Sequence, residues 1–342
     1  MKEKYFAASN SRHGFVSYYD DAFGGAERVY IIKGGPGTGK SYFMKKIAEA
    51  AEGARLSVVY IYCSSDPESL DGIVIDRRVA ILDGTAPHAM EASLPGAREE
   101  LIDLGSFFYG NGLSARCAEI AELAKNKSEA YRRAYDCLSA AGQLGEAADA
   151  LILRSIDQEK LKAAAVRSLR HLPNGAGSKK TELCVSAVGM RGEVRFSTLE
   201  EKAKSVICVR DILGTAHIYF DALLAEAERK KLNVRISRDP VMPEHIDALE
   251  LGGLLFTTAD IEGARAVNMK RFIDRASAAE VRREHRALLS AKDTAKECAK
   301  LALADAAKNH FALEKIYISY VNFDEKEKFT QEFTKKLMYD II

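Results

Sequence analysis

The sequence predicts an α/β fold in which a mostly parallel sheet is flanked by helices and the whole unit occurs twice. Three observations predict it. A glycine-rich motif joins an apolar run to a helical pattern, a second apolar run ends in aspartate, and a segment near residue 210 matches the first motif without gaps. The 342 residues are also enough for about two domains.

Composition sets the outer limits. Lys plus Arg number 50 and Asp plus Glu 49, for a net charge of +1, which argues against a general nucleic-acid binder. No apolar stretch approaches the length of a membrane helix, and the first residues lack a signal-peptide pattern. The six cysteines are scattered without metal-ligand spacing. We therefore expect a cytoplasmic protein that does not enter a membrane.

The first predicted element is a β-branched strand over residues 28–33. It leads into GGPGTGKS at residues 34–41, here called the glycine loop, which matches G-x-x-x-x-G-K-[ST] at every fixed position. A helix is predicted to follow and to end near Gly53. Strand, loop and helix in this order predict a P-loop NTPase fold. The expected nucleotide-binding residues are Gly34, Gly35, Pro36, Gly37, Thr38, Gly39, Lys40, Ser41 and Tyr42.

Each residue type in the loop has a chemical reason. Glycines allow backbone conformations in which successive N–H groups point at phosphate oxygens, and the helix adds its positive end. Lys40 is predicted to act in catalysis by reaching the β- and γ-phosphates of a nucleoside triphosphate. The Ser41 hydroxyl is predicted to bind Mg²⁺.

A second strand, over residues 79–82, ends in Asp83. This is the pattern of a Walker B strand, so Asp83 is the second predicted Mg²⁺ ligand, acting through water. The alternative is that Asp83 only caps the Gly84-Thr85 turn. Gly84 stands where many ATPases have glutamate, so the usual neighbouring catalytic base is missing.

A polar loop is predicted at residues 63–72, after a strand over residues 56–62. Asp66 and Asp71 in it, together with Glu68, are candidates to orient water or a second substrate. The equally supported alternative is that Ser65 or Asp66 only caps a helix. His88 is a candidate sensor of the γ-phosphate, with a structural loop histidine as the alternative.

An internal repeat connects the two halves of the chain. Residues 33–43 align with residues 210–220 at an offset of 177, the distance from Lys40 to His217. The alignment continues at offsets of 174 to 178. Further matched positions are Gly14 with Gly192, Pro67-Glu68 with Pro243-Glu244, Asp71 with Asp247, and Asp83 with Thr257.

The second copy lacks the residues that its chemistry would need. Lys40 is replaced by His217, Ser41 by Ile218, and three loop glycines by Asp211, Ile212 and Ala216. Isoleucine cannot bind Mg²⁺, and an aspartate repels phosphate. We expect the second half to keep the fold without ordinary Mg-nucleotide binding.

Composition then divides the chain into parts. We predict a P-loop NTPase domain over 1–112, a helical arm over 113–172, a linker and β-hairpin over 173–200, a degenerate domain over 201–275 and a C-terminal helical arm over 276–342. The predicted hairpin pairs residues 181–189 with 192–197, and its counterpart pairs 5–10 with 14–19. A basic cluster in the last arm, formed by Arg282, Arg283, His285 and Arg286, is interpreted as a solvated face, with a nucleic-acid or phosphate contact as the alternative.

The first half resembles a family of uncharacterised bacterial tandem P-loop proteins described as ATPases or ATP-binding proteins. The resemblance is carried by KGGPGTGKS at 33–41, CSSDPESLDG at 63–72 and AILDGTAPH at 80–88. It implies ATP binding and a P-loop fold, and no substrate. Tyr62 stands where the family pattern has histidine, and the family's second half usually keeps a recognisable loop.

Together these observations favour a Mg-ATP-binding ATPase or ATP-driven switch with one active site in the first half. A kinase for a small molecule or nucleotide is one alternative, because the catalytic glutamate is missing and a polar loop stands ready for an acceptor. A non-enzymatic scaffold that binds nucleotide is another. The expected partners are a nucleoside triphosphate and an unknown protein or small-molecule acceptor, with ATP preferred on the resemblance.

Overall fold

A computed structural model describes residues 2–87 and 89–342, and within them the strands form two six-stranded sheets and two short hairpins. The first sheet has the order β1-β5-β6-β7-β4-β8. Its strands run parallel except β6. The bounds are β1 Glu3–Phe6, β4 Arg28–Lys33, β5 Val58–Tyr62, β6 Leu70–Ile75, β7 Val79–Asp83 and β8 Glu99–Asp103.

The second sheet repeats this order as β9-β13-β14-β15-β12-β16, and again one strand, β14, runs against the rest. The bounds are β9 Lys180–Glu182, β12 Ser205–Arg210, β13 Val234–Arg238, β14 Ile246–Leu251, β15 Leu254–Thr257 and β16 Arg265–Asn268. The predicted α/β class, with mostly parallel sheets in two similar units, is confirmed.

The predicted hairpins are shorter than expected. They consist of β2 (Ala8–Ser11) with β3 (Gly14–Ser17) and β10 (Ser186–Gly189) with β11 (Gly192–Arg195). The residues before β2 and β10 instead form β1 and β9, each at an edge of a six-stranded sheet. The prediction was wrong there because each extended segment is divided into two strands that belong to different sheets. Sequence periodicity does not show where such a division falls. Gly14 and Gly192 turn the two hairpins at φ of 85° and 86°.

Helices account for most of the remaining chain. Those of the first repeat are α1 Tyr19–Phe23, α2 Lys40–Gly53, α3 Gly112–Ala115, α4 Cys117–Ile152 and α5 Gln158–Leu169, with 3₁₀ turns η1 Leu104–Phe107 and η2 Leu153–Ser155. Those of the second repeat are α6 Thr198–Lys202, α7 Ala216–Arg229, α8 Arg275–Ile318 and α9 Phe323–Ile341, with η3 Met269–Phe272. The predicted domain boundary at 200/201 falls inside α6.

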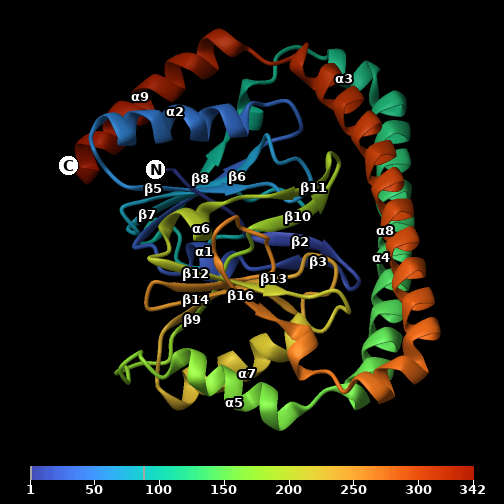
Figure 1. Ribbon diagram of the computed structural model, residues 1–342. Coiled ribbons are helices and arrows are strands. Elements are labelled where there is room, and N and C mark those ends of the chain that lie inside the picture. The colour runs from blue at the N-terminus through green and yellow to red at the C-terminus, as the bar shows by residue number, and fades with distance from the viewer. Residues whose placement is uncertain (1, 88) are drawn as a thin grey trace.

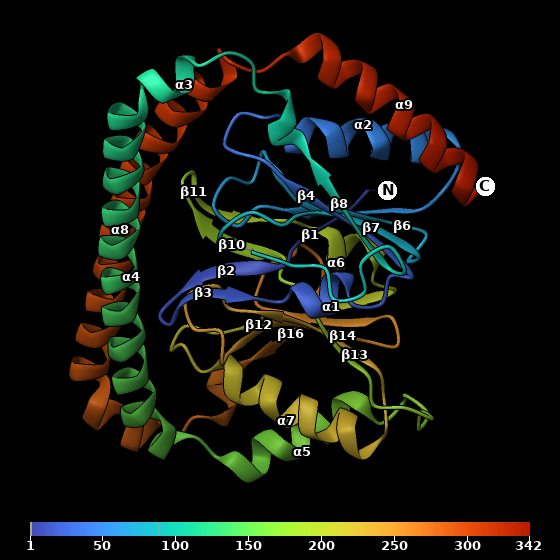
Figure 2. The same ribbon diagram turned by 180° about the vertical axis from the view of Figure 1, so that it is seen from behind.

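The long helices α4 and α8 lie side by side along one flank of the molecule, as Figures 1 and 2 show from opposite sides. Each carries the chain from its own sheet to the other one. Helix α5 of the first repeat therefore packs on α7, and α9 of the second repeat packs on α2. The predicted helical arms are thus exchanged between the halves.

The exchanged helices complete the two outer cores. Leu161, Ala165 and Leu169 of α5 are buried against α7, and Leu337 of α9 is buried in the cluster around α2. Phe329 and Phe333 of α9 add ring contacts with Phe43 of α2. Burying such side chains stabilises the fold by roughly 1.5–3 kcal/mol each. Neither half therefore has a complete core without the other repeat.

The inner faces of the two sheets share a further core, to which Tyr5, Phe23, Val185 and Leu255 contribute. At its edge the backbones of Phe6 and Cys184 bond to each other reciprocally, with N–O distances of 2.8 and 2.9 Å. Reciprocal pairing of equivalent positions is the mark of a two-fold relation. Among the described residues no helix combines the length and apolar character needed to cross a bilayer.

Candidate functional site

The glycine loop lies between β4 and α2, where the sequence predicts it. Gly34, Gly37 and Gly39 have φ of 153°, 71° and 79°, a region that side chains other than glycine rarely enter. Gly39 is the left-handed N-cap of α2. The backbone conformation of the loop thus depends on glycine at three positions.

Lys40 folds back over this loop. Its ammonium donates to the carbonyl oxygens of Gly34 and Gly35 at 2.9 and 3.1 Å and lies 3.5 Å from Oδ2 of Asp83. Strands β4 and β7 are parallel neighbours, which brings their carboxyl ends together. Asp83 also accepts from the N–H and hydroxyl of Thr85, at 2.9 and 2.6 Å, the contacts expected of a residue that caps the Gly84-Thr85 turn.

Two further loop residues take different positions. The Ser41 hydroxyl accepts from the Leu70 N–H at 3.0 Å, which ties the start of α2 to β6. Tyr42 is exposed, and the ammonium groups of Lys46 and Lys326 lie 5.5 and 5.0 Å from the centroid of its ring. The side chains of both residues border the loop.

The polar segment after β5 is tied to the second half. Arg191 donates to Asp66 at 3.0 Å and to Glu68 at 2.7 Å. Asp66 also accepts from the Ser69 hydroxyl at 2.8 Å. Asp71 lies inside β6 and is buried, so the predicted loop through residue 72 was too long. His88 lies outside the described residues.

The last turns of α8 and the start of α9 cover the glycine loop. A Cβ atom on Gly37 would lie 2.9 Å from the Glu314 carbonyl oxygen and from Ile318, and one on Gly35 would meet Tyr317 at 3.6 Å. Lys326 of α9 faces Gly39. The second repeat therefore closes over the loop of the first.

Three ionisable side chains on α4 and α8 surround Lys40. Burial lowers the pKa of Lys127 on α4 and lowers that of His310 on α8 to about 4, with Lys127 the next cause for His310. Burial raises the pKa of Glu314, and Asp66 raises it further, while Lys40 opposes that rise. The Gly37 backbone N–H also opposes the rise in the Glu314 pKa. A carboxylate from the second repeat thus lies near the N–H groups of the loop.

No sequence motif predicted a role for Lys127, His310, Glu314 or Lys326. A signal for two of them exists in the repeat, because the helical parts align at an offset of 165, as the helix N-caps Asp157 and Asn322 show. The same offset pairs Lys127 with Lys292 and Asp149 with Glu314. Only the exchange of helices, however, places these residues at the glycine loop.

In the equivalent loop of the second half, residues 211–218, the Asp211 side chain accepts hydrogen bonds from within the loop. Asp211 accepts from the backbone N–H groups of Leu213 and Ala216 and from the Thr215 hydroxyl. Gly214 is the one residue of this loop with positive φ, at 76°. Backbone N–H groups that would bind phosphate oxygens in a phosphate loop therefore donate to the Asp211 carboxylate instead.

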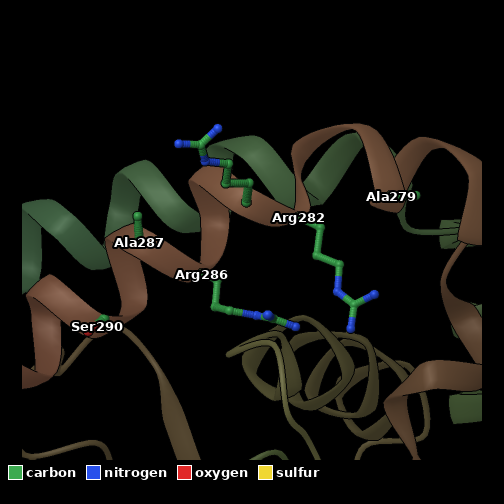
Figure 3. Close-up of a pocket in the computed structure, with 6 residues that line it drawn as sticks. Ala279, Arg282, Arg286, Ala287 and Ser290 are labelled. Atoms are coloured by element: carbon green, nitrogen blue, oxygen red, sulfur yellow. The ribbon is translucent and has the colours of Figure 1, made fainter.

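The members of the basic cluster on α8 do not all lie on one face of the helix. Arg282, Arg283 and Arg286 line an open hollow of about 720 Å³ together with Ala279, Ala287 and Ser290, and Figure 3 shows Arg282 and Arg286 extending from the same side of α8. His285 is buried near Leu213 instead. The hollow is at the opposite end of α8 from Glu314, so it is separate from the glycine loop.

Comparisons of the chain with protein-family models, with curated proteins and with solved structures found no match.

Proposed function

We propose that the first half is a P-loop NTPase that binds Mg-ATP at the glycine loop and hydrolyses it. The observation that supports this best is the approach of Lys40 Nζ to Asp83 Oδ2, 3.5 Å apart at the carboxyl ends of parallel strands, beside three positive-φ glycines. The loop N–H groups and Lys40 would hold the phosphates. Ser41 and Asp83 would hold Mg²⁺, which supplies charge neutralisation for phosphoryl transfer.

Glu314 fits the missing role of general base. Its carboxylate reaches the loop from the other repeat, and burial raises its pKa, which suits a group that accepts a proton from water. Because this carboxylate lies near the Gly37 N–H, a phosphate oxygen bound at that N–H would displace it. Nucleotide binding would thus move the end of α8, and with it α9, which makes the protein a switch as well as an enzyme.

The electrostatics of the site support a polyanionic ligand. Lys40 and Lys127 interact with each other, and Lys326 lies against Gly39, so positive charge gathers around the loop. Burial lowers the pKa of both Lys127 and Lys326, which is a cost that a bound phosphate would relieve.

The test measures Mg²⁺-dependent binding of ATP and release of phosphate by the wild type and by Lys40→Ala. Loss of the lysine should lower turnover by about 100-fold or more, because its charge is needed in the transition state. Lys308→Ala, an exposed lysine on α8, is the control and should stay within about twofold of wild type.

Turnover that persists unchanged in Lys40→Ala would refute the proposal. ATP binding without turnover would assign the scaffold role. Phosphoryl transfer that needs an added acceptor, with little basal hydrolysis, would assign the kinase role instead.

A further inference from the structure

Three metal-ligand side chains meet at the second loop. They are Asp149 near the end of α4, His217 in the first turn of α7 and His245 in the turn before β14. One ligand atom from each lies within 4.8 Å of the other two, in the described part of the chain. Nε2 of His217 and Nε2 of His245 lie 3.8 and 3.6 Å from the same oxygen, Oδ2 of Asp149.

The tautomer of His217 follows from its second nitrogen. Nδ1 lies 3.1 Å from the Gly214 carbonyl oxygen, which can only accept, so Nδ1 carries a hydrogen, and in the neutral ring Nε2 presents a lone pair. The Asp149 carboxylate facing it is an acceptor too. Two acceptors that converge without a hydrogen between them favour a cation in the space they share.

The distances fit one ion. Donor atoms about 2.1 Å from a common tetrahedral metal lie about 3.4 Å apart, close to the 3.6 and 3.8 Å seen here. The imidazole rings of His217 and His245 are stacked, with centroids 3.8 Å apart and planes 1° from parallel, and their ligand nitrogens lie within 4.8 Å of each other. The in-plane lone pairs of parallel rings do not converge, so the rings must tilt apart for both to bind one ion. The three side chains are 13% to 22% exposed, which keeps a route open to solvent.

The charge around the cluster is mixed. Lys292 on α8 interacts with Asp149 and His245, and its ammonium lies 3.4 Å from the Met242 sulfur. Asp211 and Glu146 add negative charge near Asp149. A cation bound by one carboxylate and two neutral rings is consistent with this balance.

The place in the repeat gives the cluster its meaning. His217 is the counterpart of Lys40, and Asp149 of Glu314, so the cluster occupies the position of the first half's glycine-loop site. In the first half, Lys40 interacts electrostatically there with Glu314 of the opposite repeat. In the second half the lysine is a histidine, and a second histidine stands beside it.

We propose that Asp149, His217 and His245 bind a divalent transition-metal ion, with Zn²⁺ the best fit. Two imidazole nitrogens and one carboxylate oxygen suit zinc, whereas Mg²⁺ and Ca²⁺ prefer an all-oxygen shell. The fourth position is open to water or another ligand. The ion would link α4 to α7 and to the turn before β14, and so fasten the long-helix pair to the second half.

The experiment titrates the full chain with Zn²⁺ by calorimetry, after removal of metal with a chelator and dialysis. Wild type should bind one ion per chain, and His217→Ala, His245→Ala and Asp149→Asn should each weaken binding by about 100-fold or more. His171→Ala, an exposed histidine elsewhere, should bind as wild type does. Lys40→Ala should also bind Zn²⁺ normally, so failure of the ATP proposal would leave this result unchanged.

A second measurement uses the wild type alone, so it does not depend on whether the variants fold. X-ray absorption of the Zn²⁺-loaded wild type should show two imidazole ligands in the first shell, and Co²⁺ should give the visible absorption of a four-coordinate site. Absence of stoichiometric binding, a shell without imidazole, or binding unchanged in all three ligand variants would overturn the proposal.

Discussion

The two loops of this molecule stand on the same scaffold and differ in what they can hold. Both follow an inner strand of a six-stranded sheet with the same order, and both begin a helix of 14 residues. The first has three glycines with positive φ, whereas the Asp211 side chain accepts hydrogen bonds from two backbone N–H groups of the second. Strand order and helix position therefore depend on the core, and ligand chemistry on a few loop residues.

The comparison extends to the helices above the loops. Each loop is covered by the end of a long helix that belongs to the opposite repeat, with Glu314 over the first and Asp149 over the second. Because α4 and α8 pack along their length, the two covers belong to one structural unit.

The largest expected effects test the exchange of helices. Leu337→Ala in α9 and Leu161→Ala in α5 each remove a buried leucine from an exchanged core, and each should lower the free energy of unfolding by about 3 kcal/mol. Urea denaturation measures this. Leu337→Ala should also weaken ATP binding, because α9 contacts the glycine loop, while Leu161→Ala should not. Equal effects of both on ATP affinity would contradict the comparison.

The next effect concerns the carboxylate over the first loop. Glu314→Gln should lower the rate of ATP hydrolysis by about 100-fold, since an amide cannot accept the proton from water. Nucleotide affinity should hold or rise, because the competing charge at Gly37 is gone. Steady-state kinetics with a separate binding assay would distinguish these effects. A loss of affinity with unchanged turnover would show that Glu314 acts only as a cover.

A smaller effect is pH dependence through His310. Burial lowers its pKa to about 4, with Lys127 of α4 the next cause, and Asp66 and Lys40 also face it. The unfolded chain therefore binds more protons than the folded one below about pH 6.5, so stability is complete above that pH and falls toward pH 4. At about pH 5.5 the loss should be of the order of 1 kcal/mol.

Thermal unfolding of His310→Asn at about pH 7.5 and 5.5 measures this contribution. The variant should lose less stability on acidification than the wild type does. His171→Asn, an exposed histidine, is the control. An identical pH slope in wild type and His310→Asn would exclude His310 as the cause.

The smallest effect concerns the ion pairs between the halves. Arg191→Ala removes the contacts with Asp66 and Glu68, but the arginine side chain is 42% exposed, so the loss should be about 0.5 kcal/mol. About 1 M salt should abolish the difference from wild type, because exposed charges are then screened. Denaturation at low and high salt measures it. A loss of several kcal/mol would mean that Arg191 is a main connection between the halves.

The repeat, the α/β class and the position of the glycine loop could all be predicted from the sequence. It could do so because strand, loop and helix are local patterns, and because Gly34, Gly37 and Gly39 are needed for backbone conformations set within the loop. The loss of Lys40 and Ser41 in the second copy was equally visible, since aligned positions need no knowledge of contacts.

The tertiary structure alone decided what lies opposite each loop. Glu314 is 274 positions from Lys40 in the sequence. Asp149 belongs to the first repeat, whereas His217 and His245 belong to the second. Such contacts depend on where α4 and α8 end after crossing between the sheets. Helical periodicity gives the length of these helices and the face they bury, but not the partner that they reach.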